Sequence, residues 1–321
     1  MPILIDLIIP IYNRAYCIPN LIGELEKQTF RQFRAIFVDD GSRDDSLAVL
    51  RRRLESATFP YEIVCKENGG AASARNAGLR ASTAPWIGFV DSDDGLLPTY
   101  LEQLYIAAAE SRADVSVCSF QLILEGSGKQ PQPAGDLSYE SITAAEYMRR
   151  YYTNWVGVVC MLISGSFQRE NGLFFDENCT YHEDIPFITE VIAAAGRVAH
   201  IQNDLYLYLA HPGSLSRSPR VDKFLSGIES FEKTAAKLAE SPSSAAQVFR
   251  TMAPARYYIA TLRKAAVQMS YPAFADLAKR INFRRFRSQI PNLSRGAKLA
   301  SYLMLTSKRC FYYGIRTLFK D

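Results

Sequence analysis

Short apolar runs alternate with helical patterns through the first 120 residues of the chain. The apolar runs are rich in β-branched and aromatic residues and end at turn-forming residues, a pattern that predicts strands. They occupy residues 3–9, 34–38, 62–65, 86–90 and 115–120. The helical patterns between them occupy residues 18–28, 46–54, 71–81 and 98–109. This alternation predicts right-handed crossovers and an α/β fold, with a mostly parallel sheet and helices on both faces.

The pattern changes after residue 120. Residues 143–152 and 184–195 have helical spacing, and residues 204–210 read as a strand. From residue 221 onwards the pattern is almost purely helical, with breaks near Pro242, Pro272 and Pro291. We therefore predict an α/β domain over residues 1–218 and a helical C-terminal region over residues 219–321.

The charge is unevenly distributed along the chain. The 321 residues are 48% hydrophobic, enough for a sizeable core, and the net charge is +4. Residues 250–321 hold 15 Lys and Arg against two acids, a net charge of +13, which leaves −9 for residues 1–249. An acidic front and a basic rear indicate that the two parts meet different partners.

The six cysteines and the apolar segments bear on the location of the protein. The cysteines are scattered, without a Cys-x-x-Cys pair, which favours free thiols in a reducing compartment. The first ten residues lack the basic start of a secretory signal. The longest uncharged run, residues 151–168, contains several polar side chains and is a poor membrane span. We expect a cytoplasmic protein.

Two acids stand where a predicted buried strand ends. Side chains alternate along an extended chain, so Asp91 and Asp93 should emerge on the same side. Carboxylates held together repel each other unless a cation or hydrogen-bond donors lie between them. A divalent ion that bridges phosphate oxygens would fit this place. The alternative is a solvated acidic turn before the next helix.

A second acidic pair, Asp39 and Asp40, ends another predicted strand and would lie at the same edge of the sheet, where nucleotides bind in α/β folds. The alternative is a turn that caps the next helix, with Ser42 as the N-cap. Residues 68–78 begin a helix with almost no bulky side chains and lack the Gly-x-Gly-x-x-Gly spacing. That helix could admit a ligand closely or pack tightly on the sheet.

Five motifs stand in the order and spacing of the family 2 glycosyltransferases, which the chain resembles. They are 8–13 (Ile-Ile-Pro-Ile-Tyr-Asn), 37–42 (Phe-Val-Asp-Asp-Gly-Ser), 67–70 (Glu-Asn-Gly-Gly), 73–78 (Ser-Ala-Arg-Asn-Ala-Gly) and 88–94 (Gly-Phe-Val-Asp-Ser-Asp-Asp). The resemblance is strong over residues 1 to 120 and continues more thinly to residue 216. It implies a GT-A fold and an inverting hexosyl- or N-acetylhexosaminyltransferase that uses a nucleotide sugar, usually a UDP-sugar.

The resemblance also implies which residues bind the nucleotide. Pro10 and Tyr12 would line the pocket for the uracil and ribose, and Asp39 would hold the edge of the base.

The Asp-x-Asp motif would handle the rest of the donor. Asp91 and Ser92 would approach the ribose and diphosphate, and Asp93 would hold Mg²⁺ or Mn²⁺ on that diphosphate. The metal would take up charge on the departing nucleoside diphosphate. Arg75 would either approach the nucleotide or brace the acidic edge.

Downstream, Glu183 and Asp184 resemble the family's Glu-Asp pair at the start of a helix. An inverting transfer needs one base that removes the proton of the acceptor hydroxyl while its oxygen attacks the anomeric carbon. The resemblance implies that Asp184 is this base and that Glu183 supports it. The alternative for the pair is an acidic helix N-terminus, which the helix dipole favours.

Two segments depart from the family pattern. Many relatives carry a Trp and a Lys ahead of the Glu-Asp pair, whereas residues 159–163 here read Val-Cys-Met-Leu-Ile. Leu209 stands where a basic residue is frequent in the segment that closes over the diphosphate, and His211 and Ser214 could substitute for it. Trp155 could form part of an acceptor wall, but it reads more simply as a core residue.

The basic rear interleaves Lys and Arg with aromatics at residues 280–287 and 308–320. A solvated helix face, a nucleic-acid patch and a surface for anionic lipid all use such a pattern. We favour the lipid surface and expect no nucleic acid, because many acceptors of the family this chain resembles sit on membrane-embedded carriers. An oligomer interface through the same helices is the alternative to a membrane surface.

The sequence therefore predicts the transfer of a sugar to a hydroxyl of a glycan acceptor, either lipid-linked or a precursor of a surface polysaccharide. Two other classes compete. A nucleotidyltransferase could use a similar acidic pair, but the segment after the first strand, residues 10–14, has no Gly-rich phosphate loop. A non-catalytic scaffold that binds nucleotide sugars would not need Asp184.

Overall fold

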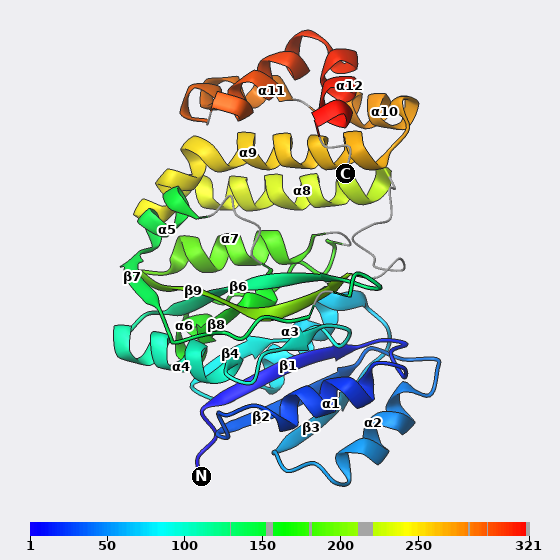
Figure 1. Cartoon of the computed structure of the whole chain (residues 1–321). Coiled ribbons are helices and arrows are strands. Elements are labelled where there is room, and N and C mark those ends of the chain that lie inside the picture. The colour runs from blue at the N-terminus through cyan, green and yellow to red at the C-terminus, as the bar shows by residue number, and fades with distance from the viewer. Residues whose placement is uncertain are drawn as a thin grey trace.

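The computed structural model describes residues 1–128, 130–151, 157–179, 182–210, 221–281, 283–293 and 295–318. The chain forms a stack of layers (Figure 1). The sheet and its helices occupy the lower half, α7 lies above the sheet, α8 and α9 run across the next layer, and α10 to α12 form the top.

The described residues form a nine-stranded sheet in the order β3-β2-β1-β4-β8-β6-β9-β5, with β7 paired to β9. The strands are β1 (Ile5–Ile11), β2 (Phe33–Asp39), β3 (Tyr61–Cys65), β4 (Trp86–Phe89), β5 (Gly95–Leu96), β6 (Val115–Leu124), β7 (Tyr139–Thr143), β8 (Met161–Ser164) and β9 (Arg197–Ala210). Strands β1 to β4 are parallel, and the other half of the sheet is mixed. The carboxyl ends of β1, β2 and β4 therefore meet at one edge.

Helices connect and cover these strands. In the first two thirds of the chain they are α1 (Ile18–Glu26), α2 (Ser46–Leu54), α3 (Gly70–Ala81), α4 (Tyr100–Ser111), α5 (Ala144–Arg150), α6 (Gly165–Glu170) and α7 (Asp184–Ala194). Helix α3 packs closely on β1, because a Cβ added to Gly78 would lie only 2.4 Å from Ile8 Cγ2. The small residues of α3 thus serve tight packing on the sheet, one of the two roles predicted for them.

The C-terminal region is helical, as predicted. It consists of α8 (Val221–Lys237), α9 (Ser244–Gln268), α10 (Tyr271–Arg280), the 3-10 segment η4 (Phe283–Asn292), α11 (Arg295–Thr306) and α12 (Lys308–Leu318). Phe231 of α8 and Phe249 of α9 belong to the main core with the sheet, whereas α10 to α12 build a second core on the other side of α8 and α9. Helices α8 and α9 therefore join the two parts.

The predicted fold class is confirmed, and the short elements are what the sequence pattern missed. Strands β5, β7 and β8 and helix α6 had not been predicted. The predicted N-cap was wrong: α2 begins at Ser46, and the Ser42 hydroxyl instead accepts a hydrogen bond from the Asn13 N–H at 3.1 Å. Among the described residues, no helix is long and apolar enough to cross a membrane.

Candidate active site

The acidic motif follows β4, and two different arginines pair with the carboxylates of its first and third residues. Asp91 Oδ1 lies 2.7 Å from Arg75 Nη2, and Asp93 Oδ2 lies 3.1 Å from Arg14 Nη2. Asp93 is partly exposed, whereas Ser92 between the two acids is buried. Each carboxylate thus has its own cation in this structure.

Asp94, to which the sequence assigned no role, ties the motif to β9. The Asp91 N–H donates to the Tyr206 hydroxyl at 3.2 Å, and that hydroxyl donates to Asp94 Oδ2 at 2.7 Å. The other oxygen of Asp94 accepts from the Leu209 N–H at 2.9 Å. Because buried polar groups are costly unless they are paired, this network fixes the acidic turn against β9.

Arg75 is the centre of the site. Its side chain is buried, and its two terminal nitrogens reach Asp91 at 2.7 Å and Glu183 Oε1 at 2.6 Å. The guanidinium also lies 5.5 Å from the centre of the Phe175 ring, within the range of a cation–π contact. Of the two roles predicted for Arg75, the contacts show the brace: it joins the end of β4 to the start of α7.

Asp184 begins α7 next to this brace. It is partly buried, and burial raises the pKa of its carboxyl to about 7; Glu183 adds to the rise and Arg75 opposes it. A Cβ added to Gly157 would lie 3.8 Å from Asp184 Oδ2, so a residue without a side chain borders the carboxylate there. A carboxyl with a pKa near neutrality suits a general base.

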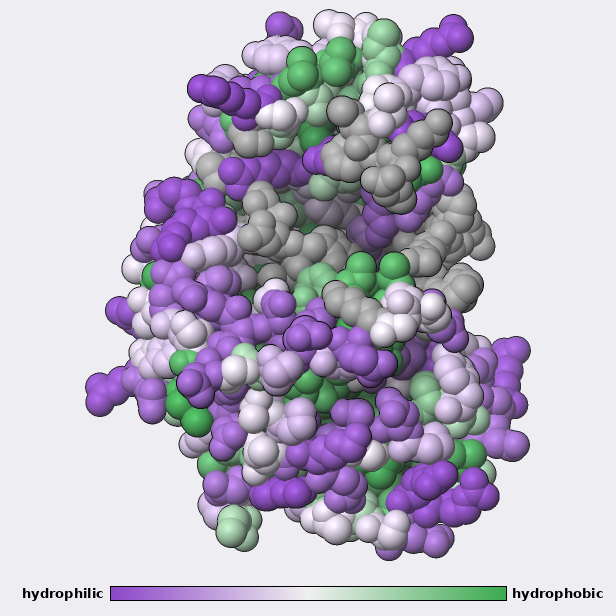
Figure 2. All heavy atoms as spheres, viewed as in Figure 1, coloured by the Kyte–Doolittle hydropathy of each residue, from purple (hydrophilic) through white to green (hydrophobic). Residues whose placement is uncertain are grey.

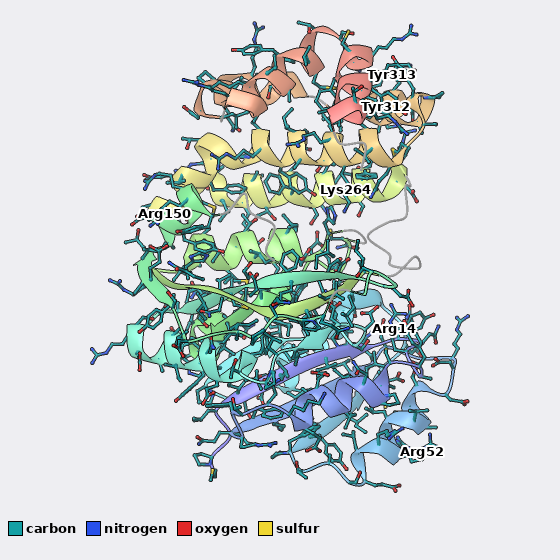
Figure 3. All side chains as sticks on the ribbon, in the orientation of Figure 1. Arg14, Arg52, Arg150, Lys264, Tyr312 and Tyr313 are labelled. Carbon is teal, nitrogen blue, oxygen red and sulfur yellow. The ribbon has the colours of Figure 1, made fainter. Side chains whose placement is uncertain are left out.

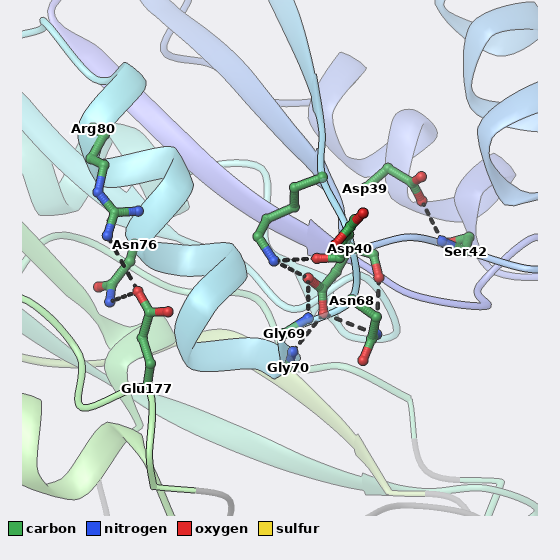
Figure 4. Close-up of polar contacts among 11 residues, drawn as sticks. Asp39, Asp40, Ser42, Asn68, Gly69, Gly70, Asn76, Arg80 and Glu177 are labelled. Atoms are coloured by element: carbon green, nitrogen blue, oxygen red, sulfur yellow. Dashed lines mark hydrogen bonds and ion pairs between the residues drawn. The ribbon is translucent and has the colours of Figure 1, made fainter.

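The two members of the second acidic pair, Asp39 and Asp40, have different contacts (Figure 4). Asp40 accepts hydrogen bonds from the N–H groups of Gly69 at 3.0 Å and Gly70 at 2.8 Å, and therefore caps the start of α3. Asp39 is buried at the end of β2 and accepts only a long bond from the Ser42 N–H at 3.4 Å among the bonds of its carboxylate that we describe. Asp40 is thus a structural residue, and Asp39 is the better placed of the two for a ligand.

The segment after β1 lies beside this pair. Pro10 is in β1, opposite Val38 of β2, and Tyr12 follows the strand with 39% of its surface exposed. Asn13 has a positive φ of 52°, which turns the chain so that Arg14 faces Asp93. Pro10, Tyr12, Asp39 and Asp93 therefore come from neighbouring strand ends, as the predicted nucleotide site requires.

Sequence reasoning missed two cations of the site. Arg14 pairs with Asp93, and its place directly after the Tyr12-Asn13 turn was the signal that could have revealed it. Lys264 of α9 lies with its Nζ 3.2 Å from Nε2 of His182, beside the Glu-Asp pair. Nothing in the local sequence of α9 indicates this contact. Figure 3 shows Lys264 in the helical layer above the sheet and Arg14 lower in the molecule, near the end of β1.

Three residues considered from the sequence lie outside the described residues. They are Trp155, His211 and Ser214.

The donor atoms at the acidic edge suit a divalent ion that is shared with a substrate. Within the described part of the chain, no three His, Cys, Asp or Glu side chains cluster as a protein-only metal site. Mg²⁺ commonly takes one or two carboxylates and completes its shell with water and substrate phosphates, so it does not need such a cluster. Asp93 fits this use, since its carboxylate is partly exposed.

The sequence has matches among known proteins. The model of glycosyl transferase family 2 matches residues 6–169, half of the chain. A relative, the uncharacterized glycosyltransferase YibD of Escherichia coli (strain K12), is 30% identical over 226 residues, which are 67% of this chain and 64% of YibD. The matched region therefore spans slightly less than two thirds of that relative.

Solved structures share the fold over almost the whole chain. S. aureus TarS 1-349, in complex with UDP-GlcNAc, has a TM-score of 0.69 at 17% identity and covers 99% of this chain and 92% of its own. The mannosyltransferase PcManGT from Pyrobaculum calidifontis, in complex with GDP-Man and Mn²⁺, has a TM-score of 0.59 at 16% identity and covers 100% of this chain and 88% of its own. These likenesses establish the GT-A-like fold, including its helical C-terminal region.

Proposed function

Because the chain belongs to glycosyl transferase family 2, we propose that it is an inverting transferase that moves a sugar from a nucleotide sugar to a hydroxyl of a glycan acceptor. One observation carries this proposal: Arg75 joins Asp91, on the donor side, to Glu183, beside the candidate base. A protein that only bound nucleotide sugars would not need an acid of near-neutral pKa at that place.

On the donor side, we assign the nucleotide to the edge formed by the ends of β1, β2 and β4. Pro10 and Tyr12 would line the uracil and ribose pocket, with Asp39 at the edge of the base. The ribose and diphosphate would lie along Asp91 and Ser92. His211 and Ser214 complete the proposed donor set from the segment after β9. The GDP-Man in the mannosyltransferase complex shows that another base is compatible with this fold, so the preference for UDP is part of the proposal.

Asp93 would hold Mg²⁺ or Mn²⁺ on the diphosphate, as the Mn²⁺ in the mannosyltransferase complex supports for the fold. When bound, the ion would take up negative charge on the nucleoside diphosphate as it leaves. Arg14, which pairs with Asp93 at 3.1 Å, and Arg75 keep the acidic edge from repelling that diphosphate.

On the acceptor side, Asp184 would take the proton of the acceptor hydroxyl. The acceptor oxygen then forms a bond to the anomeric carbon from the face opposite the diphosphate, and the bond from that carbon to the diphosphate oxygen breaks. The bonding pair leaves with the nucleoside diphosphate, so the product carries the inverted anomeric configuration. We propose that the transferred sugar is a hexose or an N-acetylhexosamine.

We propose that the acceptor is presented at an anionic membrane surface, and α11 supports this. Leu299, Tyr302 and Leu303 follow the i, i+3, i+4 spacing of one helix face and are 63%, 50% and 36% exposed. Figure 2 shows apolar side chains at the top of the molecule, in the region of α11 and α12. Exposed Arg295 and Arg309 belong to the same two helices. Apolar and basic side chains on one surface favour anionic lipid.

The residues first expected to enter the membrane are partly different. Residues 308–320 were expected on a lipid surface, but Phe311 and Tyr312 of that segment are buried in the second core. A helix that packs on one face exposes only the other, which the composition of residues 308–320 does not reveal. Tyr313, at 51% exposure, is the aromatic of α12 that faces outward.

A thermal-shift screen of UDP-, GDP- and dTDP-sugars, with Mg²⁺ or Mn²⁺ or with EDTA, tests the donor proposal. A ligand that binds only the native state raises its melting temperature, so the right donor should stabilise wild type only with the metal. Asp93→Asn should lose the metal-dependent part, and Asp45→Asn, which changes an exposed acid, should keep it. NMR of the product should then show the inverted anomer. Equal stabilisation with EDTA contradicts the metal assignment, and a retained anomer contradicts the direct attack.

A further inference from the structure

A lysine of the C-terminal region lies beside the turn that precedes the candidate base. Lys264, in the second half of α9, places its ammonium nitrogen 3.2 Å from Nε2 of His182. Both side chains are partly buried, and 82 positions of sequence separate them. Helix α9 packs directly against α7, whose first residue is Asp184. The Lys264 ammonium group therefore lies next to the turn at His182, directly before Asp184.

The chemistry of Lys264 and His182 determines which of them donates the hydrogen bond. An ammonium group has only donors, so Nε2 of His182 must accept. Burial and the nearby Lys264 charge lower the pKa of His182 to about 3, which keeps the ring neutral at physiological pH. Burial also lowers the pKa of Lys264, and the Asp184 carboxylate opposes that change. A neutral imidazole does not cancel the charge of its partner, so the field of Lys264 extends to Asp184.

Charged groups from several elements act on Asp184. Glu183 precedes it in the chain, Asp91 follows β4, Arg75 comes from α3 and Lys264 from α9. The guanidinium of Arg75 is shared between Asp91 and Glu183. Two acids thus oppose the ionised form of Asp184, and one of the two cations is already engaged with both of those acids.

We propose that Lys264 is a positioning residue for the base: through His182 it holds the turn before α7, and its charge keeps the Asp184 carboxylate ionised for the transfer reaction. The inference rests on the proposed function only in taking Asp184 as the base. It makes α9 a contributor to the active site rather than a support for it. His182 has a positive φ of 53°, a strained conformation for a residue with a side chain, so an anchoring contact at this position has a clear use.

The first test needs no substrate. The midpoints of His182 and Asp184 can be followed by NMR in protein that carries ¹³C-labelled His and Asp, with signals assigned by their loss in His182→Asn and Asp184→Asn. In Lys264→Met the titration midpoints of His182 and Asp184 should both rise, because a nearby cation is gone. For Asp184 we expect a roughly tenfold greater proton affinity. Lys264→Arg should restore both midpoints. Lys27→Met, which removes an exposed lysine of the α1 end, is the matched control and should leave them unchanged.

The second test is the pH dependence of UDP-GlcNAc turnover with water as the acceptor. The acidic limb of the Lys264→Met profile should move to higher pH, so that turnover falls roughly tenfold at pH 6 and much less at pH 9. An equal loss at every pH, or unmoved NMR midpoints, overturns the proposal and leaves Lys264 a packing residue. If wild type turns over no nucleotide sugar while the midpoints still move, the proposed function fails and the tuning of Asp184 by Lys264 stands.

Discussion

The donor side and the base side of the site are built in different ways. On the donor side, Asp39 is the last residue of β2 and Asp91 lies two residues after the end of β4, so the register of neighbouring parallel strands places them. On the base side, Asp184 starts a helix, and the cations that act on its carboxylate, Arg75 and Lys264, come from α3 and α9. The donor side thus depends on the local backbone, and the base side depends on packing between distant segments.

The largest effect should come from the base itself. Asp184→Asn should lower transfer by about two to four orders of magnitude, the usual contribution of a positioned general base, while nucleotide affinity stays unchanged. Initial rates and calorimetry measure the two quantities. Glu190→Gln, which changes another acid of the same helix, should keep both near wild type. If Asp184→Asn turns over within a few-fold of wild type, the base must be Glu183 or another group.

Arg75 is where the two sides of the site meet, so its loss should affect both. In Arg75→Met, Asp91 and Glu183 lose their shared partner, and we expect turnover to fall by roughly two orders of magnitude, the cost of misplaced reacting groups, with weaker nucleotide binding as well. Arg75→Lys keeps the charge but cannot span both carboxylates, so it should rescue little.

Arg80 provides the control for this change. It lies on the same helix and pairs with Glu177 at 3.2 Å, but 60% of its side chain is exposed, and exposed pairs contribute little. Arg80→Met should therefore leave rates near wild type. Should Arg75→Met reduce turnover without any change in nucleotide affinity, the link between the two sides is not through Arg75.

The sequence predicted the donor side better than the base side, because local backbone places the donor side and packing of distant segments builds the base side. Strands β1, β2 and β4 were found because their apolar runs are buried along most of their length, and the acids at their ends could be assigned to one edge. Strand β5 has only two residues, which is too short to carry a local pattern.

The missing contacts of the site have the same origin. Arg75 and Glu183 are 108 positions apart, and His182 and Lys264 are 82 positions apart. No local spacing in a single sequence encodes pairs of this kind. Arg75 and the carboxylates of the Asp-x-Asp motif and the Glu-Asp pair could be named in advance, whereas Arg14 and Lys264 required the packed structure.

A third prediction concerns the outermost layer, which neither side of the site needs. Full-length protein should sediment with anionic phosphatidylglycerol vesicles more than with neutral phosphatidylcholine vesicles, and binding should weaken with salt. The triple change of Leu299, Tyr302 and Leu303 to Ser should weaken vesicle binding by roughly tenfold, because apolar area no longer enters the interface. The same change to Ser at exposed Leu122 and Leu124 on β6 is the control.

Two results would count against this surface. Equal sedimentation with both vesicle types means that charge does not direct binding. No binding to anionic vesicles at low salt, together with a change from oligomer to monomer in the triple variant, assigns the same apolar face to a second copy of the chain.

The smallest effect we expect is that of Asp184→Asn on stability. Its sign distinguishes Asp184 from an ordinary surface acid. An unfolded Asp titrates near 3.8, whereas Asp184 titrates at about 7 in the native state. Between these values the native state binds more protons than the unfolded state, so the free energy of unfolding falls as pH rises from about 4 to about 7 and then levels off.

An Asn side chain does not titrate, so it does not lower the free energy of unfolding as the pH rises. Asp184→Asn should therefore melt several degrees above wild type at pH 8 and at the same temperature near pH 4. Asp45→Asn, an exposed acid, should show no such pH-dependent gain. Equal melting temperatures of Asp184→Asn and wild type at pH 8 would mean that Arg75 and Lys264 together offset the burial of the carboxylate, and the base would then be ionised well below neutral pH.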